Sequence, residues 1–587
     1  MKSRGQQRQL LIVISLCLIL PLPACNRSRF TSESFLTTQQ SSVSATESKV
    51  SEATETTKQS ETSETPETVI TVITVTTAET TETTETTEIT ETVEATETTE
   101  TVLTAETTKS TKVTETTVAV PTETTQPATT TTATTAPAKP ALSEIAAEIH
   151  RNAMVIDTHC DTLLDIVDED TWLPVMDISR QTSSMVDIPK MQKGGIDVQV
   201  FAAFTSGYAL SAGGQDFNKA NSRLLSLING LKWTLNKNPD ALQPIYQLKS
   251  IGDALQAGRI GIISSIEGAY SLNKDTGIEL LRQYYDLGVR MLAPTWSYSN
   301  ELGEGVNNKY RDGTPSSGGL TELGKAVIFE MNRLGMVVDV SHMNEATFWD
   351  SLETSSAPVI ASHSCVFNLC ANVRNLKDEQ IQAIANGGGV IQVNFHRPFL
   401  AADPTTVTID TLVDHIDYIV NLAGIDHVGL GSDFDGAKMP QGLADASMMP
   451  NITGELLSRG YNEGDIRKIL GENSARVFSE IEGKASASGS AAGAPEIKAG
   501  IAMGANVQSE TPLLTAVITA GTGGTLDVGS LKAVVDGNAS TLLFDEATGT
   551  ASISMAAPLT EKFHVVTFIA ANLGGEPTRE TIIFRIQ

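Results

Sequence analysis

Cysteine is scarce in this sequence: five occur among 587 residues, two of them within the first 25. The other three, Cys160, Cys365 and Cys370, cannot all pair, and no Cys-x-x-Cys spacing occurs. Small disulfide-bonded scaffolds and cysteine-based structural zinc sites are therefore excluded. Basic residues are also few, with 41 Lys and Arg against 70 Asp and Glu. The net charge of -29 argues against a partner such as nucleic acid.

Long apolar runs are equally rare, and the clearest one, residues 10–20, follows the basic residues Lys2 and Arg4. A basic start, a short apolar run and small residues before a cleavage point predict a secretory signal over residues 1–25. The run is too short for a comfortable membrane span. The segment Leu-Pro-Ala-Cys25 also resembles a bacterial lipobox, in which the cysteine carries a lipid and becomes the mature N-terminus. We therefore expect an extracellular bacterial lipoprotein anchored to the cell membrane at Cys25, or otherwise a secreted protein.

Aromatic residues are nearly missing from residues 31–140, where Phe35 is the only one beside 42 Thr and 18 Glu. Such a segment buries too little apolar surface to offset the entropy that ordering would cost. Like-charged Glu side chains also repel one another and extend the chain. The sequence therefore predicts a disordered Thr/Glu-rich linker over residues 26–141, which acts as a stalk.

From residue 142 to residue 483 short apolar runs alternate with amphipathic segments, as in an α/β domain. Helices are predicted, for example, over 320–334 and 411–423, where apolar residues recur at three-to-four spacing. Eight strand candidates fit a closed (β/α)8 barrel of the TIM type with elaborated loops. They are residues 154–160, 196–204, 260–267, 289–296, 336–342, 358–363, 389–395 and 427–433.

A run of small residues over 484–494 marks a second boundary. Beyond it, residues 495–587 carry short alternating runs separated by Gly and Asn turns, which predict a small all-β, immunoglobulin-like sandwich. We expect this module to be separable from the barrel and able to contact a cell wall or surface. His564, in one of its runs, is expected to be a plain surface or packing residue.

Five side chains of the kind that bind metal follow the predicted strands of the barrel: His159, Asp161, Glu267, His342 and His363. Strand ends that each deliver an acid or an imidazole to one place are typical of the top face of a (β/α)8 barrel. Imidazoles and carboxylates together suit Zn2+ or a similar divalent ion. One such histidine alone is as well explained by packing in the core, but the whole set favours a metallohydrolase.

Five ligands exceed the needs of one catalytic zinc, for which three protein ligands and a water suffice. Two-metal sites hold their ions about 3.5–4 Å apart, a carboxylate can bridge them, and a water shared by them attacks carbonyls as hydroxide. Glu267 stands alone on its strand, between the His-Asp pair and the two later histidines, which makes it the natural bridge. Asp157 shares a strand face with His159, but we expect it to be a hydrogen-bonding group rather than a ligand.

Two further polar residues suggest how substrate is handled. Gly429 and Gly431 are expected to leave space beneath Asp433, so that its carboxylate takes a proton from the nucleophile and passes it to the leaving amine. A sixth metal ligand or a loop cap is the alternative for Asp433. Arg374 carries a guanidinium fork that binds a carboxylate through two hydrogen bonds, which would restrict substrates to short peptides with a free C-terminus. A surface arginine in a polar loop is the alternative for Arg374.

Several motifs taken together resemble the membrane dipeptidase (renal dipeptidase) family of zinc hydrolases, over about residues 145–480. They are VIDTHCDTLLD, SSIEGA, LGVRML, GMVVDVSH, PVIASHS, VRNLKDEQ, HVGLGSDFDG and GENSARVF. The resemblance implies a (β/α)8 barrel that holds two zinc ions. It places one zinc on His159 and Asp161, the other on His342 and His363, and Glu267 between them.

The resemblance also implies that Asp433 is the catalytic acid/base, contacting the substrate amine, and that Arg374 holds the terminal carboxylate. Family members commonly carry a substrate-binding histidine where this chain has Trp296. The stretch before Arg374 also reads Ala-Asn-Val instead of the usual Asp-His-Pro. We expect Trp296 to contact substrate and favour a bulky or apolar side chain; packing beneath the loop 297–318 is the alternative.

The leading hypothesis is a surface-anchored zinc dipeptidase that cleaves dipeptides with metal-activated hydroxide. A related binuclear amidohydrolase acting on another small amide or lactam is the second hypothesis. The third is a catalytically silent surface adhesin, against which the complete ligand set argues. The oligomeric state stays open, with a homodimer as one option.

Overall fold

The computed structural model describes residues 141–206, 210–211, 214–486 and 493–587. The predicted secretory signal and, except for its last residue, the Thr/Glu-rich linker lie outside the described residues. Most of the small-residue linker over 484–494 lies outside them too. Among the helices that the structure describes, none combines the length and the apolarity needed to cross a membrane.

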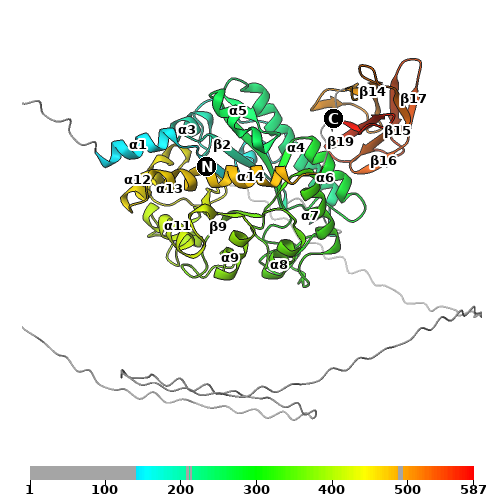
Figure 1. The fold of residues 1–587 in the computed structure, drawn as a ribbon. Coiled ribbons are helices and arrows are strands. Elements are labelled where there is room, and N and C mark those ends of the chain that lie inside the picture. Colours follow the sequence, from blue (N-terminus) through cyan, green and yellow to red (C-terminus); the bar gives the residue numbers. More distant parts are fainter. Residues whose placement is uncertain (1–140, 207–209, 212–213, 487–492) are drawn as a thin grey trace, which may run out of the picture. The chain divides into compact units, whose positions relative to one another are not determined.

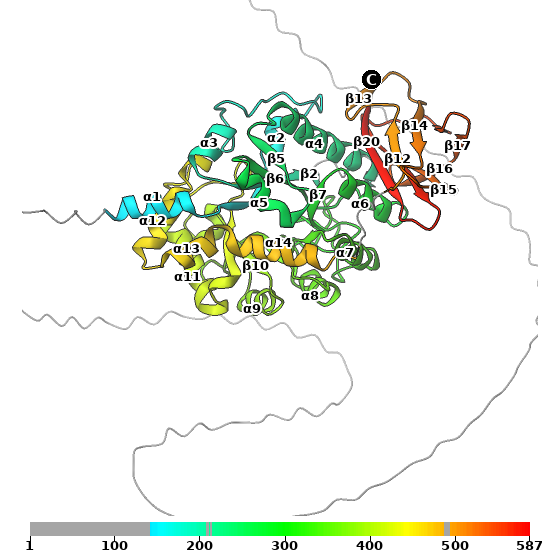
Figure 2. The same ribbon diagram turned by 45° about the horizontal axis from the view of Figure 1, so that its top comes forward.

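The larger domain is built on parallel strands, one overlapping each of the eight predicted strand segments (Figures 1 and 2). One sheet has the order β1-β2-β6-β7-β8, with β5 (Leu242–Pro244) beside β6, and the other has the order β11-β10-β9. The eight strands are β1 (Ile156–Cys160), β2 (Val198–Phe204), β6 (Ile260–Glu267), β7 (Val289–Ala293), β8 (Val337–Val338), β9 (Ile360–Ser364), β10 (Val390–Asn394) and β11 (Val428–Gly431).

Two single parallel bridges connect the edges of these sheets. Asp339, just after β8, pairs with Ile360 of β9, and Cys160 of β1 pairs with Phe434 beyond β11. The strands are buried along almost their whole length, and in β6 all eight residues are buried. Parallel strands that are covered on both faces read as apolar runs, which is why the sequence located them well.

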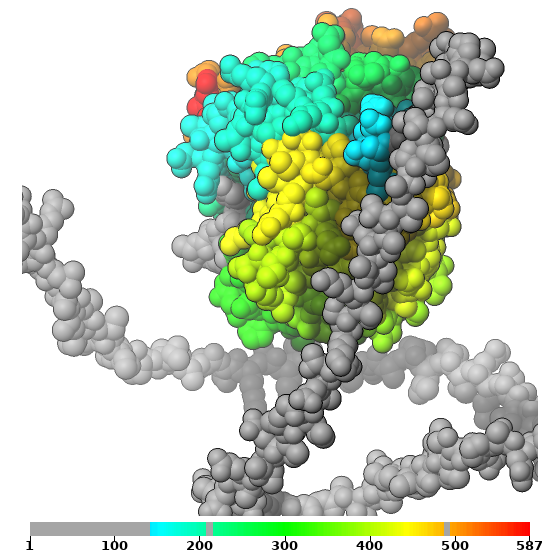
Figure 3. Space-filling model, turned by 90° about the vertical axis from the view of Figure 1, so that its left-hand side faces the viewer, coloured from blue at the N-terminus to red at the C-terminus, as the bar shows by residue number. Residues whose placement is uncertain are grey.

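Helices connect the strands and lie outside them (Figures 1 and 2). Helix α1 packs against α12, so segments from opposite ends of the domain lie side by side (Figure 3). The helices are α1 (Leu142–Asn152), α2 (Leu163–Ile166), α3 (Ile188–Lys193), α4 (Phe217–Lys237), α5 (Ile251–Gln256), α6 (Gly277–Asp286), α7 (Glu322–Leu334), α8 (Glu345–Thr354), α9 (Asp378–Asn386), α10 (Arg397–Leu400), α11 (Ile409–Ala423), α12 (Pro450–Ser458), α13 (Glu463–Arg467) and α14 (Asn473–Gly483).

Helix α7 shows how local sequence sets such boundaries. The side chain of Thr321 accepts a hydrogen bond from the backbone N–H of Gly324 and so caps the first turn. Gly335 ends the helix at φ 74°, a left-handed conformation that glycine adopts without strain. The chain then enters β8, two residues long, which leads to one of the predicted metal ligands.

Residues from 496 onward form a β-sandwich of two sheets, β12-β14-β18-β17 and β13-β20-β19-β15-β16. Side chains of both sheets meet in one apolar core that includes Ile518, Ile553 and Phe568. The immunoglobulin-like type of this sandwich stays a prediction. The strands are β12 (Glu496–Ala499), β13 (Ala505–Val507), β14 (Leu513–Thr519), β15 (Leu526–Val535), β16 (Asn538–Ser540), β17 (Leu542–Asp545), β18 (Thr550–Ser554), β19 (Phe563–Asn572) and β20 (Thr578–Ile586).

The sandwich packs on the α/β domain, where the sequence predicted a separable module. Phe563 and Val565 of β19 are buried in the same apolar cluster as the core of the larger domain. Gln283 of α6 donates to Val534 O and to Thr567 Oγ1, and it accepts from the N–H of Gly537. Buried polar contacts of this kind are satisfied only when the two parts stay together.

His564 and the three cysteines of the described chain have structural environments. His564 is buried rather than exposed, and its Nδ1 lies 2.6 Å from Oδ2 of Asp536. In the described chain Cys160, Cys365 and Cys370 are all free and buried, as expected for a protein that is not a disulfide scaffold.

Candidate active site

The predicted metal-binding side chains all lie at the C-terminal ends of the parallel strands. His159 and His363 lie on β1 and β9, Glu267 is the last residue of β6, and Asp161 and His342 follow β1 and β8. All five are buried, none with more than 7% of its surface exposed. The structure therefore brings together side chains that are scattered over about two hundred residues of sequence.

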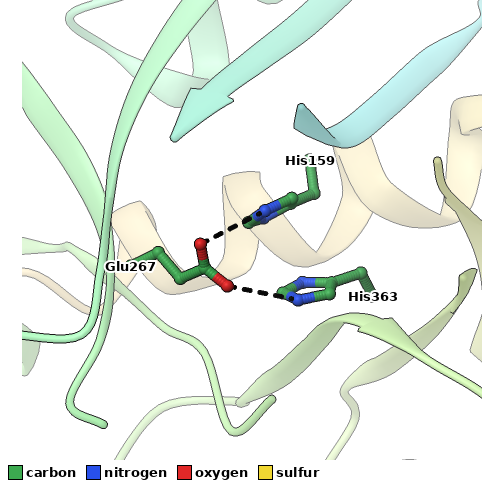
Figure 4. A group of neighbouring side chains, drawn as sticks. All are labelled: His159, Glu267 and His363. Atoms are coloured by element: carbon green, nitrogen blue, oxygen red, sulfur yellow. Dashed lines mark ion pairs between the residues drawn. The ribbon is translucent and has the colours of Figure 1, made fainter. Parts of the chain in front are cut away.

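Glu267 lies between His159 and His363, and its carboxylate points toward both (Figure 4). Its Oε1 lies 2.9 Å from Nε2 of His342 and 3.5 Å from Nε2 of His363. Its Oε2 lies 3.7 Å from Nε2 of His159. The two carboxylate oxygens thus point toward different imidazoles, as a carboxylate between two cations would.

A second group contains His159, Asp161 and Asp433, whose ligand atoms lie within 4.8 Å of one another. Oδ2 of Asp161 is 3.8 Å from Nε2 of His159. Gly436 closes this side: a Cβ there would lie 1.9 Å from Oδ2 of Asp161 and 2.8 Å from Oδ1 of Asp433. Any other residue at position 436 would displace one of these carboxylates.

The donor set fits a divalent metal. Nδ1 and Nε2 of His159 and Oδ1 of Asp161 are buried and have no hydrogen-bond partner among the described residues. Burying polar atoms without partners costs free energy, so such atoms mark a site that something else completes. Imidazole nitrogens with carboxylate oxygens are a donor set that suits zinc.

The ionisation behaviour of the cluster supports the same conclusion. Burial raises the pKa of Glu267 and lowers the pKa of His342 and of His363. Burial also lowers the pKa of His159, but Glu267 and Asp161 outweigh it and raise this pKa to about 10. The carboxylates therefore attract positive charge to a buried place, and a divalent cation would supply that charge.

Two of these residues have a left-handed backbone that non-glycine residues rarely adopt. His342 has φ 69° and Asp433 has φ 62°. Hydrogen bonds hold both turns: the N–H of Val306 donates to His342 O, and the N–H of Asp433 donates to His159 O. Such conformations cost of order 1–3 kcal/mol each and cluster at functional sites.

Arg374 reaches the same place from the loop after β9. It is buried, and its Nη2 donates to the carbonyl of His363 at 3.1 Å, while its Nε has no partner among the described residues. Its guanidinium lies 5.5 Å from the ring centre of Phe399. Arg374 and Asp433 line one cavity of about 310 Å3 together with Asp161, Glu267, His342 and His363.

Comparison with known proteins identifies the family of this chain. The family model described as membrane dipeptidase (peptidase family M19) matches residues 143–491. The chain belongs to this family. It is thereby a metallo-dipeptidase of peptidase family M19, as the motifs of the sequence indicated.

Its relatives span fungi and bacteria. An uncharacterized dipeptidase of Schizosaccharomyces pombe is 34% identical over 346 residues, which cover 57% of this chain and 82% of the relative. A metallopeptidase structure from Rhodobacter sphaeroides, bound to a phosphinate mimic of L-Ala-D-Ala, is 27% identical with a TM-score of 0.50 and covers 56% of this chain and 99% of that one. A probable dipeptidase from Pseudomonas aeruginosa is 25% identical with a TM-score of 0.53 and covers 59% and 99%.

Two residues of this M19 dipeptidase site were missed by the sequence reasoning. Asn394, the last residue of β10, donates from Nδ2 to Oδ2 of Asp433 at 2.9 Å. His396, two residues later, lines the cavity, and its Nδ1 accepts from the backbone N–H of Lys438 at 3.0 Å. The neutral ring therefore carries its proton on Nε2. The signal was available, because both are polar residues at a strand end.

Trp296 lines the cavity three residues beyond β7. Its ring centre lies 5.0 Å from that of Phe204, 5.6 Å from that of Tyr298 and 5.6 Å from that of His342. With Phe399 on the cavity wall as well, the site of this dipeptidase presents three aromatic faces. Trp296 thus lies where it can contact substrate and also packs on Tyr298 of the following loop.

Other acidic residues near the cluster have structural roles. Asp157 accepts from the N–H and Oγ of Ser432, at 2.8 and 2.6 Å, and from Nε2 of Gln199 at 2.9 Å. It therefore ties β1 to the segment after β11, as expected of a hydrogen-bonding group. Asp435 accepts from Oγ1 of Thr162 at 2.6 Å.

Proposed function

We propose that this M19 metallo-dipeptidase is a binuclear zinc enzyme that hydrolyses dipeptides. The observation that carries this proposal is Glu267, whose two oxygens face different imidazoles. His159 and Asp161 would hold one ion and His342 and His363 the other, with Glu267 bridging them. Zinc bound there supplies Lewis acidity, which polarises a carbonyl oxygen and lowers the pKa of a water.

Asp433 is the residue that moves the proton in this proposal. Burial, and then the charge of Asp161, raise the pKa of Asp433 to about 7, the range in which one carboxyl both accepts and returns a proton near neutral pH. Asn394 holds Oδ2, and Oδ1 would serve the reacting groups. Asp433 takes the proton of the attacking water and gives it to the amine that leaves.

Arg374 is the residue that selects dipeptides. Its guanidinium would bind the free carboxylate of the substrate, because a buried fork of N–H donors with an unpartnered Nε matches that group. The cavity volume of about 310 Å3 lies at the small end of ligand pockets. A clamp for one terminus in a small cavity leaves room for a short substrate only.

The aromatic side chains that line the cavity affect which dipeptides can bind. Trp296, Phe204 and Phe399 favour apolar side chains, and the ligand of the Rhodobacter sphaeroides relative mimics L-Ala-D-Ala. We propose that dipeptides with an apolar residue, including a C-terminal D-residue, are substrates. The same wall favours the second candidate, hydrolysis of another small apolar amide or lactam. A Trp296→His variant is expected to shift preference among dipeptides, whereas unchanged preference would make Trp296 a packing residue.

The fold and the location of the enzyme complete the proposal. The bridges Asp339–Ile360 and Cys160–Phe434 join the edges of the two sheets, which supports one closed (β/α)8 barrel. For location, the support is the sequence alone: a signal-like N-terminus that ends in Leu-Pro-Ala-Cys25. We propose that the protein is an extracellular lipoprotein anchored to the cell membrane. Cys25→Ser is expected to release it from the membrane fraction, and unchanged association would contradict the anchor.

Metal analysis combined with a dipeptide panel tests the proposal as a whole. The purified protein is expected to hold close to two zinc ions per chain, and a chelator should abolish a dipeptidase activity that Zn2+ restores. Glu267→Gln should lower both metal content and rate, because a bridging carboxylate serves both ions. Metal-free protein that still cleaves dipeptides would contradict the mechanism, and metal-loaded protein that cleaves only other amides would favour the second candidate.

A further inference from the structure

One ring nitrogen of His363 faces the cluster of predicted metal ligands, and the other contacts a serine. Its Nε2 lies 2.9 Å from Nε2 of His342 and 3.5 Å from Oε1 of Glu267, and its Nδ1 lies 2.7 Å from Oγ of Ser362. A contact between a hydroxyl and an imidazole nitrogen can run in either direction. The direction decides which nitrogen carries the ring proton, and only the other one can bind a metal.

The hydroxyl of Ser362 is already committed to a carboxylate. Its Oγ donates to Oδ2 of Asp339 at 2.5 Å, and a carboxylate oxygen accepts. The other hydroxyl within reach, Ser341 Oγ, is 3.5 Å away. The single proton of the Ser362 hydroxyl therefore lies toward Asp339, and a lone pair of Oγ faces His363.

Asp339 is fixed in the orientation that this requires. It is buried, 2% exposed, and its Oδ1 accepts from the backbone N–H of Ser341 at 3.0 Å and of Ser362 at 2.9 Å. It also lies at the bridge that pairs the β8 segment with β9. The chain therefore holds this carboxylate from both strands that deliver the two histidines.

We infer that Asp339 and Ser362 are positioning residues that set the proton of His363 on Nδ1. The ring then donates to Ser362, and the lone pair of Nε2 faces the cluster, where it can accept from Nε2 of His342, 2.9 Å away, before any metal arrives. This inference rests on the proposed function, because an exposed Nε2 lone pair is useful only to a metal ligand. The partner of His342 differs: Oγ of Ser297 lies 2.9 Å from its Nδ1, and no described carboxylate is bonded to that hydroxyl.

Asp339→Asn tests the inference because it reverses the relay with little change of shape. The two backbone N–H groups require an oxygen at the Oδ1 position, so the new amide NH2 must face Ser362. The hydroxyl of Ser362 would then accept from the amide and donate to Nδ1 of His363, which moves the ring proton to Nε2. Zinc affinity of the full chain, measured by competition with a chelator, is expected to fall about 10- to 100-fold.

The second readout needs no metal. In metal-free protein labelled with 15N-histidine, His363 is expected to carry its proton on Nδ1 in the wild type and on Nε2 in Asp339→Asn. Ser364→Ala is the matched control, because that buried hydroxyl contacts only Ser341 Oγ, at 3.4 Å, among the described hydrogen bonds. This control should keep both the affinity and the position of the proton.

The outcomes separate this inference from the proposed function. A folded Asp339→Asn protein that binds zinc like the wild type, or a wild type with the proton on Nε2, overturns the inference. A wild type that binds no zinc but has the proton on Nδ1 supports the relay and overturns the proposed function. If Asp339→Asn does not fold, Ser362→Ala takes its place: lower zinc affinity supports the relay, and unchanged affinity overturns it.

Discussion

At the scale of single residues, the neighbours of Asp433 act on its pKa in opposite directions. Asn394 donates to its Oδ2, whereas burial and the charge of Asp161 raise its pKa to about 7. Asp433→Asn is expected to lower kcat by about 10^2- to 10^4-fold, the range for losing a general acid/base, while metal content stays unchanged. Steady-state kinetics and metal analysis check this, with Asp161→Asn as the comparison that should lose metal. Loss of metal in Asp433→Asn would make Asp433 a ligand instead.

Arg374 supports a second prediction at this scale. Hydrogen bonds to charged groups contribute about 1.5–3 kcal/mol, which corresponds to roughly 10- to 150-fold in KM. Arg374→Ala is expected to raise KM for dipeptides by this factor and to spare amides that lack a free carboxylate. Kinetics on both substrate types in the same variant provide the internal control. Equal damage to both types would reject the carboxylate clamp.

Single residues also show which members of the site the sequence did not predict. His159, Glu267 and His363 were predictable because each lies at the C-terminal end of an apolar strand, and strand ends converge. Asn394 ends β10 and His396 follows it, yet an amide and a lone imidazole have many roles and neither belongs to a motif. Their partners, Asp433 and Lys438, lie about forty residues away and appear only in the folded chain.

At the scale of elements, the turn after β11 shapes the site more than the strand does. The sequence placed Asp433 on this strand, with Gly429 and Gly431 clearing space beneath it. The strand instead ends at Gly431, and a Cβ there would lie 1.9 Å from the carbonyl of Ser362. These glycines admit neighbouring groups, and the left-handed backbone of Asp433 aims its carboxylate.

Gly436 in this turn supports a prediction that distinguishes an effect on the metal site from an effect on folding. A Cβ at position 436 would lie 1.9 Å from Oδ2 of Asp161, so Gly436→Ala is expected to displace that carboxylate and reduce zinc occupancy and activity together. The melting temperature of the metal-free protein should change little. Gly454→Ala in α12 is the matched control, since a methyl group there would meet nothing within 4 Å and alanine favours helices. Full zinc occupancy in Gly436→Ala would contradict this role.

At the scale of the whole molecule, the sandwich and the α/β domain share buried contacts. One of them joins Asp536 of the sandwich, which accepts from Nδ2 of Asn221 on α4, whereas within the sandwich Asp536 also accepts from the N–H of Val565 and contacts His564. The described residues of both parts belong to one compact unit. Removal of the sandwich would therefore expose apolar surface of the enzyme, which separable modules do not do.

The pair His564–Asp536 predicts how stability depends on pH. Burial lowers the pKa of His564, but the hydrogen bond and the charge of Asp536 outweigh it, so this pKa is raised above 6.5. The folded state thus favours the protonated ring, and the gain is full below the unfolded value of about 6.5 and is lost as pH rises through the folded pKa. The Tm difference between wild type and His564→Gln is expected to be largest below that value and to shrink at alkaline pH. A difference that grows with pH would contradict the assignment.

The sequence by itself determined the α/β domain, the sandwich that follows it and the residues that meet in the site, because apolar periodicity and strand-end residues are local signals. Only the tertiary structure decided the contacts between residues that lie far apart in sequence. It placed one oxygen of Glu267 toward His342 and the other toward His159, linked Asp339 through Ser362 to His363, and packed the sandwich on the enzyme. Contacts between side chains far apart along the chain leave no periodic trace in sequence, so their geometry exists only once the chain has folded.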